Sequence, residues 1–300
     1  MLTFIIKFFN YIFGKTKYKS KISSLEKDLS ILKCLLDYEL IKNKYEELFK
    51  IIALKSPLMI NLIRCGSMND GGYVIADNLD STNQVLSFGV GSNFDFESDL
   101  AKKGKVIYMF DGTLKNTPKN TLNVNFINKN VYGSSFIESE KLKPNRNDNY
   151  LHINDIFSKN LIRDAAGKLV ALNLDSDILL KMDIEGAEYD AITSLEKFYF
   201  DSFSQIVIEF HDIYRNLFQG ENKLIKSIAI LNKTHELISI HGNNFGAYLT
   251  FNGNDYPDVI ETTWLRKDLA NFENSENHFN SKLAAPNNPG AREIVFHWSI

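Results

Sequence analysis

The sequence predicts an α/β fold built around a mostly parallel β-sheet. Short apolar runs typical of buried strands alternate with segments of helical periodicity between residues 84 and 265. A small or acidic residue directly follows several of these runs, where a strand would turn into a loop. Because consecutive parallel strands are usually joined by helices, the alternation indicates a sheet covered on both faces.

The size and composition are those of an ordinary globular protein. The 300 residues suit one large domain with an appendage, or two small domains. The chain is 44% hydrophobic and 24% charged, and its net charge of −3 argues against nucleic acid as the main partner. The two cysteines, Cys34 and Cys65, form no metal-binding or redox pattern, so we expect buried thiols in a cytoplasmic protein.

The first 21 residues are aromatic and basic and contain no acidic residue. Their apolar part is about 12 residues long, which is too short for a helix that needs roughly 20 residues to span a bilayer. No small-residue cleavage site of a signal peptide follows it. Two interpretations stay open: a segment that lies in a membrane interface, or a helix that packs on its own domain or on a partner.

Residues 22–50 are predicted to form a helix. Leucine and isoleucine at alternating spacings of three and four give a seam of about two heptads. Since coiled coils usually need three or four heptads, three interpretations stay open: packing on the domain body, a modest dimer contact, or a true coiled coil. The segment KSPL ends the helix, so we place a boundary near residue 55, between an N-terminal segment 1–55 and a main domain 56–300.

The main domain is predicted to alternate strands and helices. The segment NDGGYVI, which includes Tyr73, is expected to form a hairpin turn or a loop that folds over the functional site, and residues 274–289 a surface loop. The predicted strands are 84–88, 106–110, 124–127, 178–182, 205–210, 237–240 and 259–265, and the predicted helices are 94–103, 189–198 and 224–234.

Five residues are predicted to gather at one edge of the sheet. Each lies at or near the C-terminal end of a different predicted strand, and these ends share one edge when the strands are parallel. Ligands of open parallel sheets bind in the crevice along that edge. The five residues are Gly89, Asp111, Asp183, Glu209 and His241.

The segment SFGVGSN is a glycine turn after a strand. Gly89 and Gly91 would let the backbone approach a ligand closely, although any tight turn from strand to helix can use this pattern. The third glycine of the dinucleotide fingerprint is absent, because Phe94 takes its place. Asp111 can accept hydrogen bonds from the hydroxyls of an adenosine ribose; the alternative is a turn residue before Gly112.

The segment DILLKMDIEGAEYDAI carries the strongest local signal. Its apolar strand ends at Asp183, and Gly186 allows a sharp turn into the next helix. Glu185 and Glu188 would lie near the helix N-terminus, where negative charge is favourable. That effect accounts for Glu188 but not for Asp183, because a charge at the end of a buried strand is costly unless something binds it.

The segment IEFHD adds further candidate ligands. Glu209 and His211 are two residues apart and share a face if the strand continues. With Asp183 on the neighbouring strand they could bind a divalent metal ion, Mg²⁺ or Mn²⁺, and the alternative is a hydrogen-bonded polar cluster. His241 is either a base, since a neutral imidazole suits proton abstraction near neutral pH, or a structural histidine.

On these segments the chain resembles the FkbM family of S-adenosylmethionine-dependent methyltransferases. LLKMDIEGAEYDAI is similar to that family's segment Lys-x-Asp-x-Glu-Gly-Ala-Glu, and HINDIF, which includes Asp155, resembles the short segment usually found upstream. LSFGVGSNFDFE resembles the cofactor turn, except that Phe88 stands where the family more often has Asp. NDGGYVI is similar to an extra element that precedes the cofactor turn in a subset of the family. The resemblance covers about residues 61–270 and leaves out residues 1–55.

The resemblance implies a Rossmann-like class I methyltransferase fold, with a seven-stranded, mostly parallel sheet whose last strand is antiparallel. Here an N-terminal helical extension would precede it. The resemblance also implies S-adenosylmethionine bound across Gly89, Gly91 and Asp111, with Tyr73 and Asp183 beside it, and O-methylation, commonly of sugars or polyketide-like metabolites.

The expected mechanism is in-line attack of an acceptor hydroxyl on the sulfonium methyl group. Asp183 is the first candidate to position or deprotonate that hydroxyl, with His241 and His211 as alternatives. If a metal ion binds Asp183, Glu209 and His211, the metal would acidify the hydroxyl and His241 would become the expected base.

The expected acceptor is a saccharide of a cell-surface glycan or its precursor. The N-terminus suits an enzyme that works in the cytoplasm, at the inner face of the membrane, with residues 1–21 touching the membrane and residues 22–50 forming a dimer contact. Two other functions stay open. One is a nicotinamide-dependent oxidoreductase, which the missing third glycine disfavours. The other is a non-catalytic module that docks through residues 1–55.

Overall fold

The computed structural model describes residues 38–48, 50–114, 123–141, 149–159, 161–173, 177–218, 222–275, 283 and 285–295. The chain divides into two compact units, Met1–Glu46 and Glu47–Ile300. Residues 38–48 are helical, as predicted, whereas the segment 1–21 and the heptad positions 22–36 lie outside the described residues. Among the described residues, no helix is long and apolar enough to cross a membrane.

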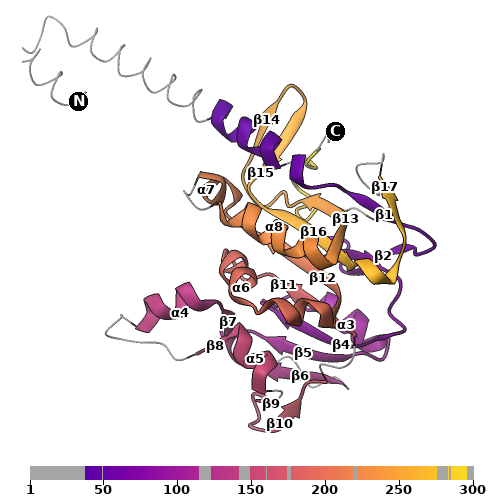
Figure 1. Cartoon of the computed structure of the whole chain (residues 1–300), viewed down its shortest axis with the longest axis vertical. Helices are drawn as coiled ribbons and strands as arrows, with labels where there is room; N and C mark the ends of the chain where they lie inside the picture. The colour runs from indigo at the N-terminus through magenta and orange to yellow at the C-terminus, as the bar shows by residue number, and fades with distance from the viewer. Residues whose placement is uncertain are drawn as a thin grey trace, which may run out of the picture. The chain divides into compact units, whose positions relative to one another are not determined.

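The second unit is built on a seven-stranded sheet, which confirms the predicted α/β class (Figure 1). Six strands run parallel, and the last strand of the sheet in sequence is antiparallel to both of its neighbours. This arrangement is compatible with a Rossmann-like fold. In spatial order the strands are β13 (His235–Gly242), β16 (Ile260–Arg266), β12 (Phe203–Phe210), β11 (Asp177–Met182), β4 (Thr82–Phe88), β5 (Val106–Phe110) and β6 (Val124–Ile127).

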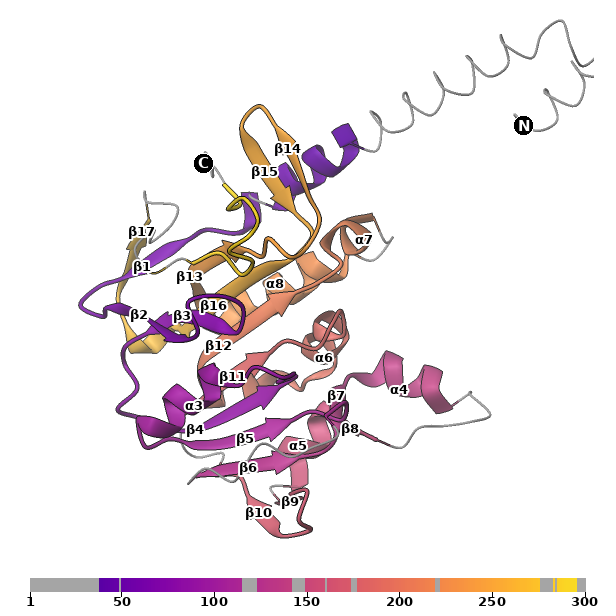
Figure 2. The same ribbon diagram turned by 180° about the vertical axis from the view of Figure 1, so that it is seen from behind.

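Both faces of the sheet are covered, as the alternation of strands and helices predicted (Figures 1 and 2). One face carries α3 (Asp95–Lys102) and the hairpin of β2 (Leu62–Gly66) and β3 (Gly72–Ala76). The other face carries α5 (Ile153–Lys159), α6 (Glu188–Ser194), the 3-10 helix η1 (Lys197–Ser202) and α8 (Lys223–Thr234).

The core on the hairpin side joins three layers of side chains. Tyr73 of the hairpin and Phe96 of α3 meet edge to face, with ring centroids 5.3 Å apart, and both belong to one core cluster with Val85 and Leu179 of the sheet. Cys65 lies in this core as a buried thiol, as predicted, and burial raises its pKa to about 11. Because these residues come from separate segments, the hairpin is held firmly against the face of the sheet.

The remaining elements are short and were not predicted. They comprise β1 (Lys55–Pro57) paired with β17 (Phe272–Asn274), β7 (Asn130–Tyr132) with β8 (Tyr150–His152), β9 (Leu161–Arg163) with β10 (Leu169–Ala171), β14 (Tyr248–Phe251) with β15 (Asn254–Pro257), the helices α4 (Ser134–Lys141) and α7 (Ile213–Phe218), and the 3-10 helix η2 (Lys267–Leu269). Strands of three or four residues carry too little periodicity to be read from sequence.

The predicted helix 189–198 is too long. Helix α6 ends at Ser194 because the next two residues, Leu195 and Glu196, adopt extended backbone with ψ of 131° and 134°. The chain then enters η1, and Phe198 is an exposed residue of that 3-10 helix. The loop predicted at 274–289 is described only in part: β17 reaches Asn274 and residues 285–289 are irregular.

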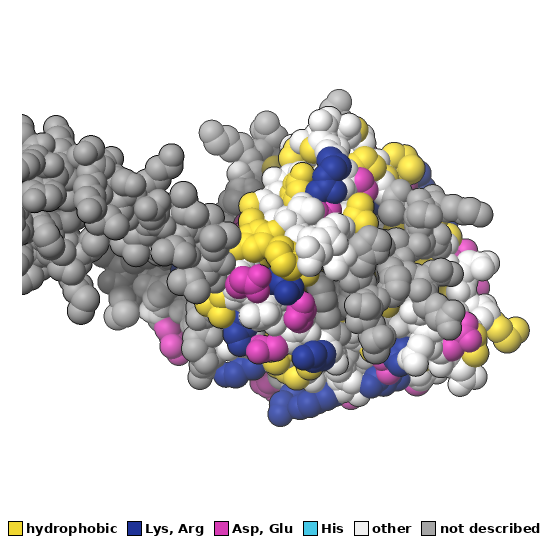
Figure 3. Space-filling view, turned by 90° about the horizontal axis from the view of Figure 1, so that it is seen from above, with side chains coloured by type: hydrophobic (Ala, Val, Ile, Leu, Met, Phe, Trp, Pro, Cys, Tyr) yellow, Lys and Arg dark blue, Asp and Glu magenta, His cyan; other side chains and the backbone are white. Residues whose placement is uncertain are grey.

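The surface carries charges of both signs. In the view of Figure 3 the described Lys and Arg side chains are interspersed with Asp and Glu side chains and hydrophobic groups. On the described part of this face the mixture does not form the basic patch typical of a nucleic-acid-binding surface.

The ends of four parallel strands are flush at the carboxyl edge of the sheet. Phe88 pairs with Phe110 on one side and Met182 on the other, and Met182 pairs with Ile208. The next residue on each strand therefore falls in one row, as predicted. That row consists of Gly89, Asp111, Asp183 and Glu209.

Candidate functional site

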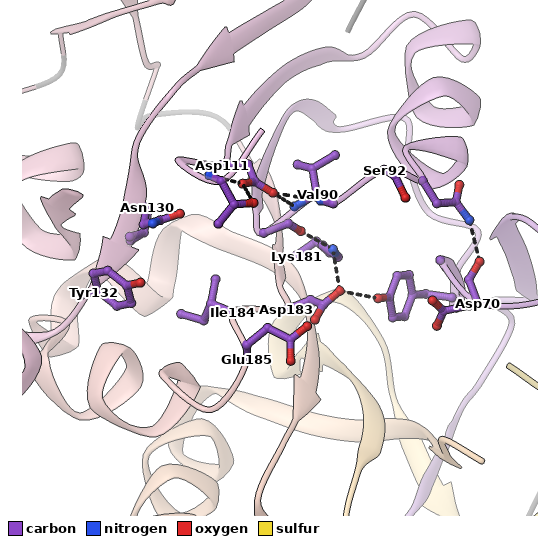
Figure 4. A pocket seen from close by; sticks show the side chains of 17 residues that line it. Asp70, Val90, Ser92, Asp111, Asn130, Tyr132, Lys181, Asp183, Ile184 and Glu185 are labelled. Atoms are coloured by element: carbon purple, nitrogen blue, oxygen red, sulfur yellow. Dashed lines mark hydrogen bonds and ion pairs between the residues drawn. The ribbon is translucent and has the colours of Figure 1, made fainter. Parts of the chain in front are cut away.

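A cavity lies where the strand order reverses. From β4 the chain runs outward to β6, and β11 then returns to the other side of β4, which is the place where open parallel sheets bind ligands. The cavity has a volume of about 330 Å³ and is lined by the loops after β4, β5 and β11, by β7 and by the hairpin (Figure 4). The predicted site residues that line it are Tyr73, Gly89, Gly91, Asp111 and Asp183.

The loop between β2 and β3 forms one wall of this cavity. Asp70 and Gly71, from the segment NDGGYVI, line it. The side-chain amide of Asn93 donates a hydrogen bond to the carbonyl of Asp70 at 2.6 Å, which ties the loop to the glycine turn. The segment is thus a hairpin connection and a wall of the site at once, so both predicted alternatives apply.

The glycine turn needs its first glycine for two reasons. Gly89 has φ of +74°, a conformation that side chains disfavour, and a Cβ atom there would lie 1.7 Å from the carbonyl oxygen of Asp183. Gly91 has φ of +61°, but a Cβ atom there would meet no atom within 4 Å. The backbone at Gly91 is consequently open toward the cavity that it lines.

Asp111 holds the glycine turn in place. Its Oδ2 accepts hydrogen bonds from the backbone N–H groups of Val90 and Gly91, at 3.0 and 2.8 Å. Its Oδ1 accepts from the N–H and the hydroxyl of Thr113, at 2.8 and 2.6 Å. Although burial opposes it, this hydrogen bonding lowers the pKa of Asp111. The four acceptor positions of the carboxylate are filled, so a ribose hydroxyl would have to replace one of these donors.

Asp183 faces the cavity from the end of β11 and is held by two neighbours. Its Oδ2 accepts hydrogen bonds from Lys181 Nζ at 3.1 Å and from the Tyr73 hydroxyl at 3.3 Å (Figure 4). Burial alone would lower the pKa of Lys181, but the charges of Asp183 and Glu97 outweigh it and raise the pKa. Burial, and then the charge of Asp183, raises the pKa of Tyr73, so the phenol stays a donor.

Glu209 is buried beside Asp183 on the neighbouring strand, as predicted. Its Oε2 accepts a hydrogen bond from the Tyr73 hydroxyl at 3.1 Å, and its Oε1 accepts one from the Asn243 amide at 2.6 Å. Burial, and then the charge of Asp183, raises the pKa of Glu209 to about 8. A single phenol therefore links the two carboxylates.

His211 completes a cluster with these two carboxylates. Its Nε2 lies 3.8 Å from Oδ1 of Asp183 and 3.7 Å from Oε1 of Glu209, and its Nδ1 lies 3.1 Å from Oε1 of Glu188. Burial by itself lowers the pKa of His211, but the hydrogen bond to Glu188 and the surrounding carboxylates raise it to about 10. The structure thus brings Asp183, Glu209 and His211 together, with one ligand atom of each within 4.8 Å of the others.

The backbone beside this cluster is strained at two non-glycine residues. Glu185 has φ of 55° and Asp212 has φ of 53°, and each lies next to the end of a central strand. Gly186, the residue after Glu185, has φ of 94° and makes the predicted sharp turn into α6, and a Cβ atom there would lie 3.4 Å from Oδ2 of Asp212. Left-handed backbone at non-glycine residues costs free energy and tends to occur at functional sites.

His241 lies in the same row of the sheet but away from the cavity. It pairs with Glu261 of β16, which in turn pairs with Glu209, so β16 stands between His241 and the cluster. Neighbouring strands are about 4.8 Å apart, which puts the backbones of His241 and Glu209 roughly 10 Å from each other. His241 does not line the cavity.

The hydrogen bonds of His241 also do not suit the expected base. Nδ1 lies 3.2 Å from Glu261 and Nε2 lies 2.7 Å from Glu293. Burial lowers the pKa of His241, but these two carboxylates outweigh it and raise the pKa to about 9. At neutral pH the ring is therefore protonated, and this geometry lends no support to a base at His241.

Sequence reasoning missed four residues that shape the site. Lys181 anchors Asp183, Thr113 fills Oδ1 of Asp111, Asn243 fills Oε1 of Glu209, and Glu97 is buried on α3 near Lys181. Only Lys181 had a detectable signal, because it is a lysine inside the otherwise apolar run 178–182 of its strand. The others lie in loops or on a helix, where polar residues are ordinary.

In comparisons with known proteins, no protein-family model matches the chain, and no curated protein matches it significantly.

Proposed function

We propose that this protein is an S-adenosylmethionine-dependent O-methyltransferase that acts on a hydroxyl of a saccharide, in a cell-surface glycan or its precursor. The observation that carries the proposal is the charge of the cavity. Four carboxylates line it, those of Asp70, Asp111, Asp183 and Glu185, against one lysine, Lys181. That lysine is already paired with Asp183.

This charge favours a cationic ligand over an anionic one. The sulfonium group of S-adenosylmethionine is positive, so carboxylates near it lower its free energy in the cavity. The diphosphate of a nicotinamide dinucleotide is negatively charged, so the same carboxylates would repel it. The cavity also lacks the third glycine that would bring a helix N-terminus to a diphosphate, since Phe94 is at that position.

The nucleoside would lie along the glycine turn. Gly91 leaves open space above its backbone, and Asp111 lies directly below the turn. A ribose hydroxyl that replaces the Thr113 hydroxyl at Oδ1 would keep all acceptor positions of Asp111 filled. The seven-stranded sheet with an antiparallel last strand agrees with what the resemblance implies.

Asp183 is the group proposed to act on the acceptor. Its Oδ2 is held by Lys181 and Tyr73, while Oδ1 points toward His211. The acceptor hydroxyl would give its proton to Asp183 as its oxygen bonds to the methyl carbon, and the S–CH₃ bond would break with its electron pair left on sulfur. Alignment of the two substrates supplies about 7–11 kcal/mol of the reduction in barrier.

The acceptor class rests on the resemblance and on the aromatic, basic residues 1–21, which lie outside the described residues. The test is a calorimetric titration of the purified full chain with S-adenosylhomocysteine, with NAD as the control ligand. Micromolar binding of S-adenosylhomocysteine without binding of NAD supports the proposal and justifies a screen of saccharide acceptors. Binding of NAD alone, or of neither ligand, overturns it.

A further inference from the structure

We infer that Asp183, Glu209 and His211 form a binding site for one divalent metal ion of the first transition series, such as Mn²⁺. The inference follows from the geometry of the cluster and stands apart from methyl transfer. Only the role suggested for the ion, binding and acidifying an oxygen of the acceptor, rests on the proposed function. With the ion bound, Asp183 would act as its ligand and not as the proton acceptor.

The ligand atoms are spaced close to what one ion requires. Metal ions of this kind bind nitrogen and oxygen ligands at roughly 2.1 Å, so two ligands of one ion lie at most about 4.2 Å apart. Nε2 of His211 lies 3.8 Å from Oδ1 of Asp183 and 3.7 Å from Oε1 of Glu209. One ligand atom of each of the three residues lies within 4.8 Å of the others, so the three could surround one ion after the side chains move slightly closer together.

The imidazole of His211 is oriented as a ligand. Its Nδ1 is hydrogen-bonded to Oε1 of Glu188, a fully buried carboxylate, which leaves Nε2 directed at Asp183 and Glu209. A carboxylate on the far ring nitrogen is the usual partner of a metal-binding histidine, because it fixes the ring and the tautomer. The same oxygen of Glu188 accepts the N–H groups of Ile184 and Gly186, so Glu188 is itself fixed.

The two carboxylate ligands are also oriented by hydrogen bonds from neighbouring side chains. The Tyr73 hydroxyl lies within hydrogen-bond distance of both and can donate its one hydrogen to either. Asn243 donates to Glu209, and Lys181 fixes the orientation of Asp183. Neutral donors such as Tyr73 and Asn243 position a carboxylate without supplying the positive charge that would balance it. Oriented ligands of this kind cost little to arrange when an ion binds.

An independent observation comes from the second oxygen of Glu188. Oε2 is buried and has no hydrogen-bond partner among the described residues. An unpaired carboxylate oxygen in the interior is costly, and here it lies on the residue that holds His211. Asp183, Glu185, Glu188 and Glu209 surround His211, with Lys181 as a further cation. A divalent ion would balance this excess of negative charge.

The mixed ligand set indicates the kind of ion. Two carboxylates and one imidazole suit Mn²⁺, Fe²⁺ or Zn²⁺ better than Mg²⁺, which prefers oxygen ligands alone. Three protein ligands leave coordination positions open, and Asp183 also lines the cavity. The exposed carboxylate of Glu185, whose Oε2 lies 3.7 Å from Nε2 of His211, is placed to become a fourth ligand. The remaining positions would bind an oxygen of the acceptor.

The test uses the full chain after treatment with a chelator and dialysis. Mn²⁺ is titrated into it, and free Mn²⁺ is followed by electron paramagnetic resonance. We expect one tightly bound ion per chain, with affinity reduced at least about tenfold in His211→Gln and Glu209→Gln. The matched controls His152→Gln and Glu236→Gln, from outside the cluster, should bind as the unaltered chain does.

Two further measurements keep the outcomes distinct. If the buried variants do not fold by circular dichroism, Asp183→Asn at a partly exposed position takes their place. S-adenosylhomocysteine is titrated into the same samples. Failure to bind Mn²⁺, or equal affinity in the cluster variants and the controls, overturns the metal site even if S-adenosylhomocysteine binds. Binding of Mn²⁺ without S-adenosylhomocysteine supports the metal site and counts against the proposed function alone.

Discussion

Lys181 and Asp183 form an ion pair of 3.1 Å in which the lysine is buried and the aspartate faces the cavity. They are two residues apart at the end of β11, so their side chains leave the sheet on the same face. Lys181 also donates to the carbonyl of Gly89 and lies 5.6 Å from the centre of the Tyr73 ring. This lysine thereby connects the glycine turn, the hairpin and the acidic cluster.

Replacement of Lys181 by methionine should destabilise the fold. The change keeps the length of the side chain but removes the cation that balances Asp183 and the buried Glu97. Loss of one partner of a buried ion pair costs about 3–5 kcal/mol, and the value should fall at the lower end because Asp183 can reach solvent. Urea unfolding measures the loss. Lys102→Met, at an exposed pair with Asp99, is the control and should change little. Equal losses in both variants would contradict the role of Lys181.

Replacement of Asp183 by asparagine should lower turnover by orders of magnitude while leaving cofactor binding nearly intact. The amide keeps the shape and the contact with Tyr73, but it can neither accept a proton nor bind an ion as a carboxylate does. We expect a fall of about 10²–10⁴-fold in the rate of methyl transfer to a saccharide found by screening. Asp80→Asn, at an exposed turn before β4, should keep its activity. An unchanged rate in Asp183→Asn would remove Asp183 from the mechanism.

Most strands of the sheet could be predicted because they span five residues or more and carry apolar segments, whereas β6 has only four residues. Strand β12 is buried at all eight positions, and a run of this length and composition is typical of a strand covered on both faces. The register was predictable as well, since residues that end parallel strands must share an edge. The sequence therefore places Asp183 and Glu209 at one edge, and the expectation that they lie on neighbouring strands is confirmed by the pairing of β11 with β12.

The contacts made through loops and through β16 could not be predicted. The insertion of antiparallel β16 between β12 and β13 separates His241 from Glu209. The order of strands in a sheet cannot be predicted from the local sequence of each strand. The four donors to Asp111 come from its own loop and from backbone N–H groups, whose positions depend on the folded turn. The partner of a buried lysine such as Lys181 likewise depends on tertiary packing.

Alanine at the two glycines of the turn should have different effects. Gly89→Ala places a Cβ atom 1.7 Å from the Asp183 carbonyl oxygen and should destabilise the fold by more than about 2 kcal/mol. Gly91→Ala meets no atom within 4 Å, so it should cost only about 1 kcal/mol for its left-handed backbone. Its methyl group would occupy space above the turn and weaken binding of S-adenosylhomocysteine. Urea unfolding and calorimetry separate the two effects. Unweakened binding in Gly91→Ala would place the cofactor elsewhere.

His235 should make the stability of the protein depend on pH in the acidic range. The ring is fully buried, with Nε2 3.0 Å from the carbonyl oxygen of Phe203 and Nδ1 2.7 Å from the hydroxyl of Thr234. A neutral ring satisfies both contacts by donating to the carbonyl from Nε2 and accepting from the hydroxyl at Nδ1. Burial lowers the pKa of His235 from 6.5 to about 4.

Between these two pKa values the unfolded chain binds a proton that the folded chain excludes. The stabilisation is complete above pH 6.5 and is lost as the pH falls from 6.5 to 4, by a total of about 3 kcal/mol. His235→Gln cannot titrate, yet its amide can still donate to the Phe203 carbonyl. We expect urea unfolding at pH 7, 5.5 and 4.5 to show a steeper fall for the unaltered chain than for the variant. Parallel curves would show that the buried ring of His235 does not resist protonation.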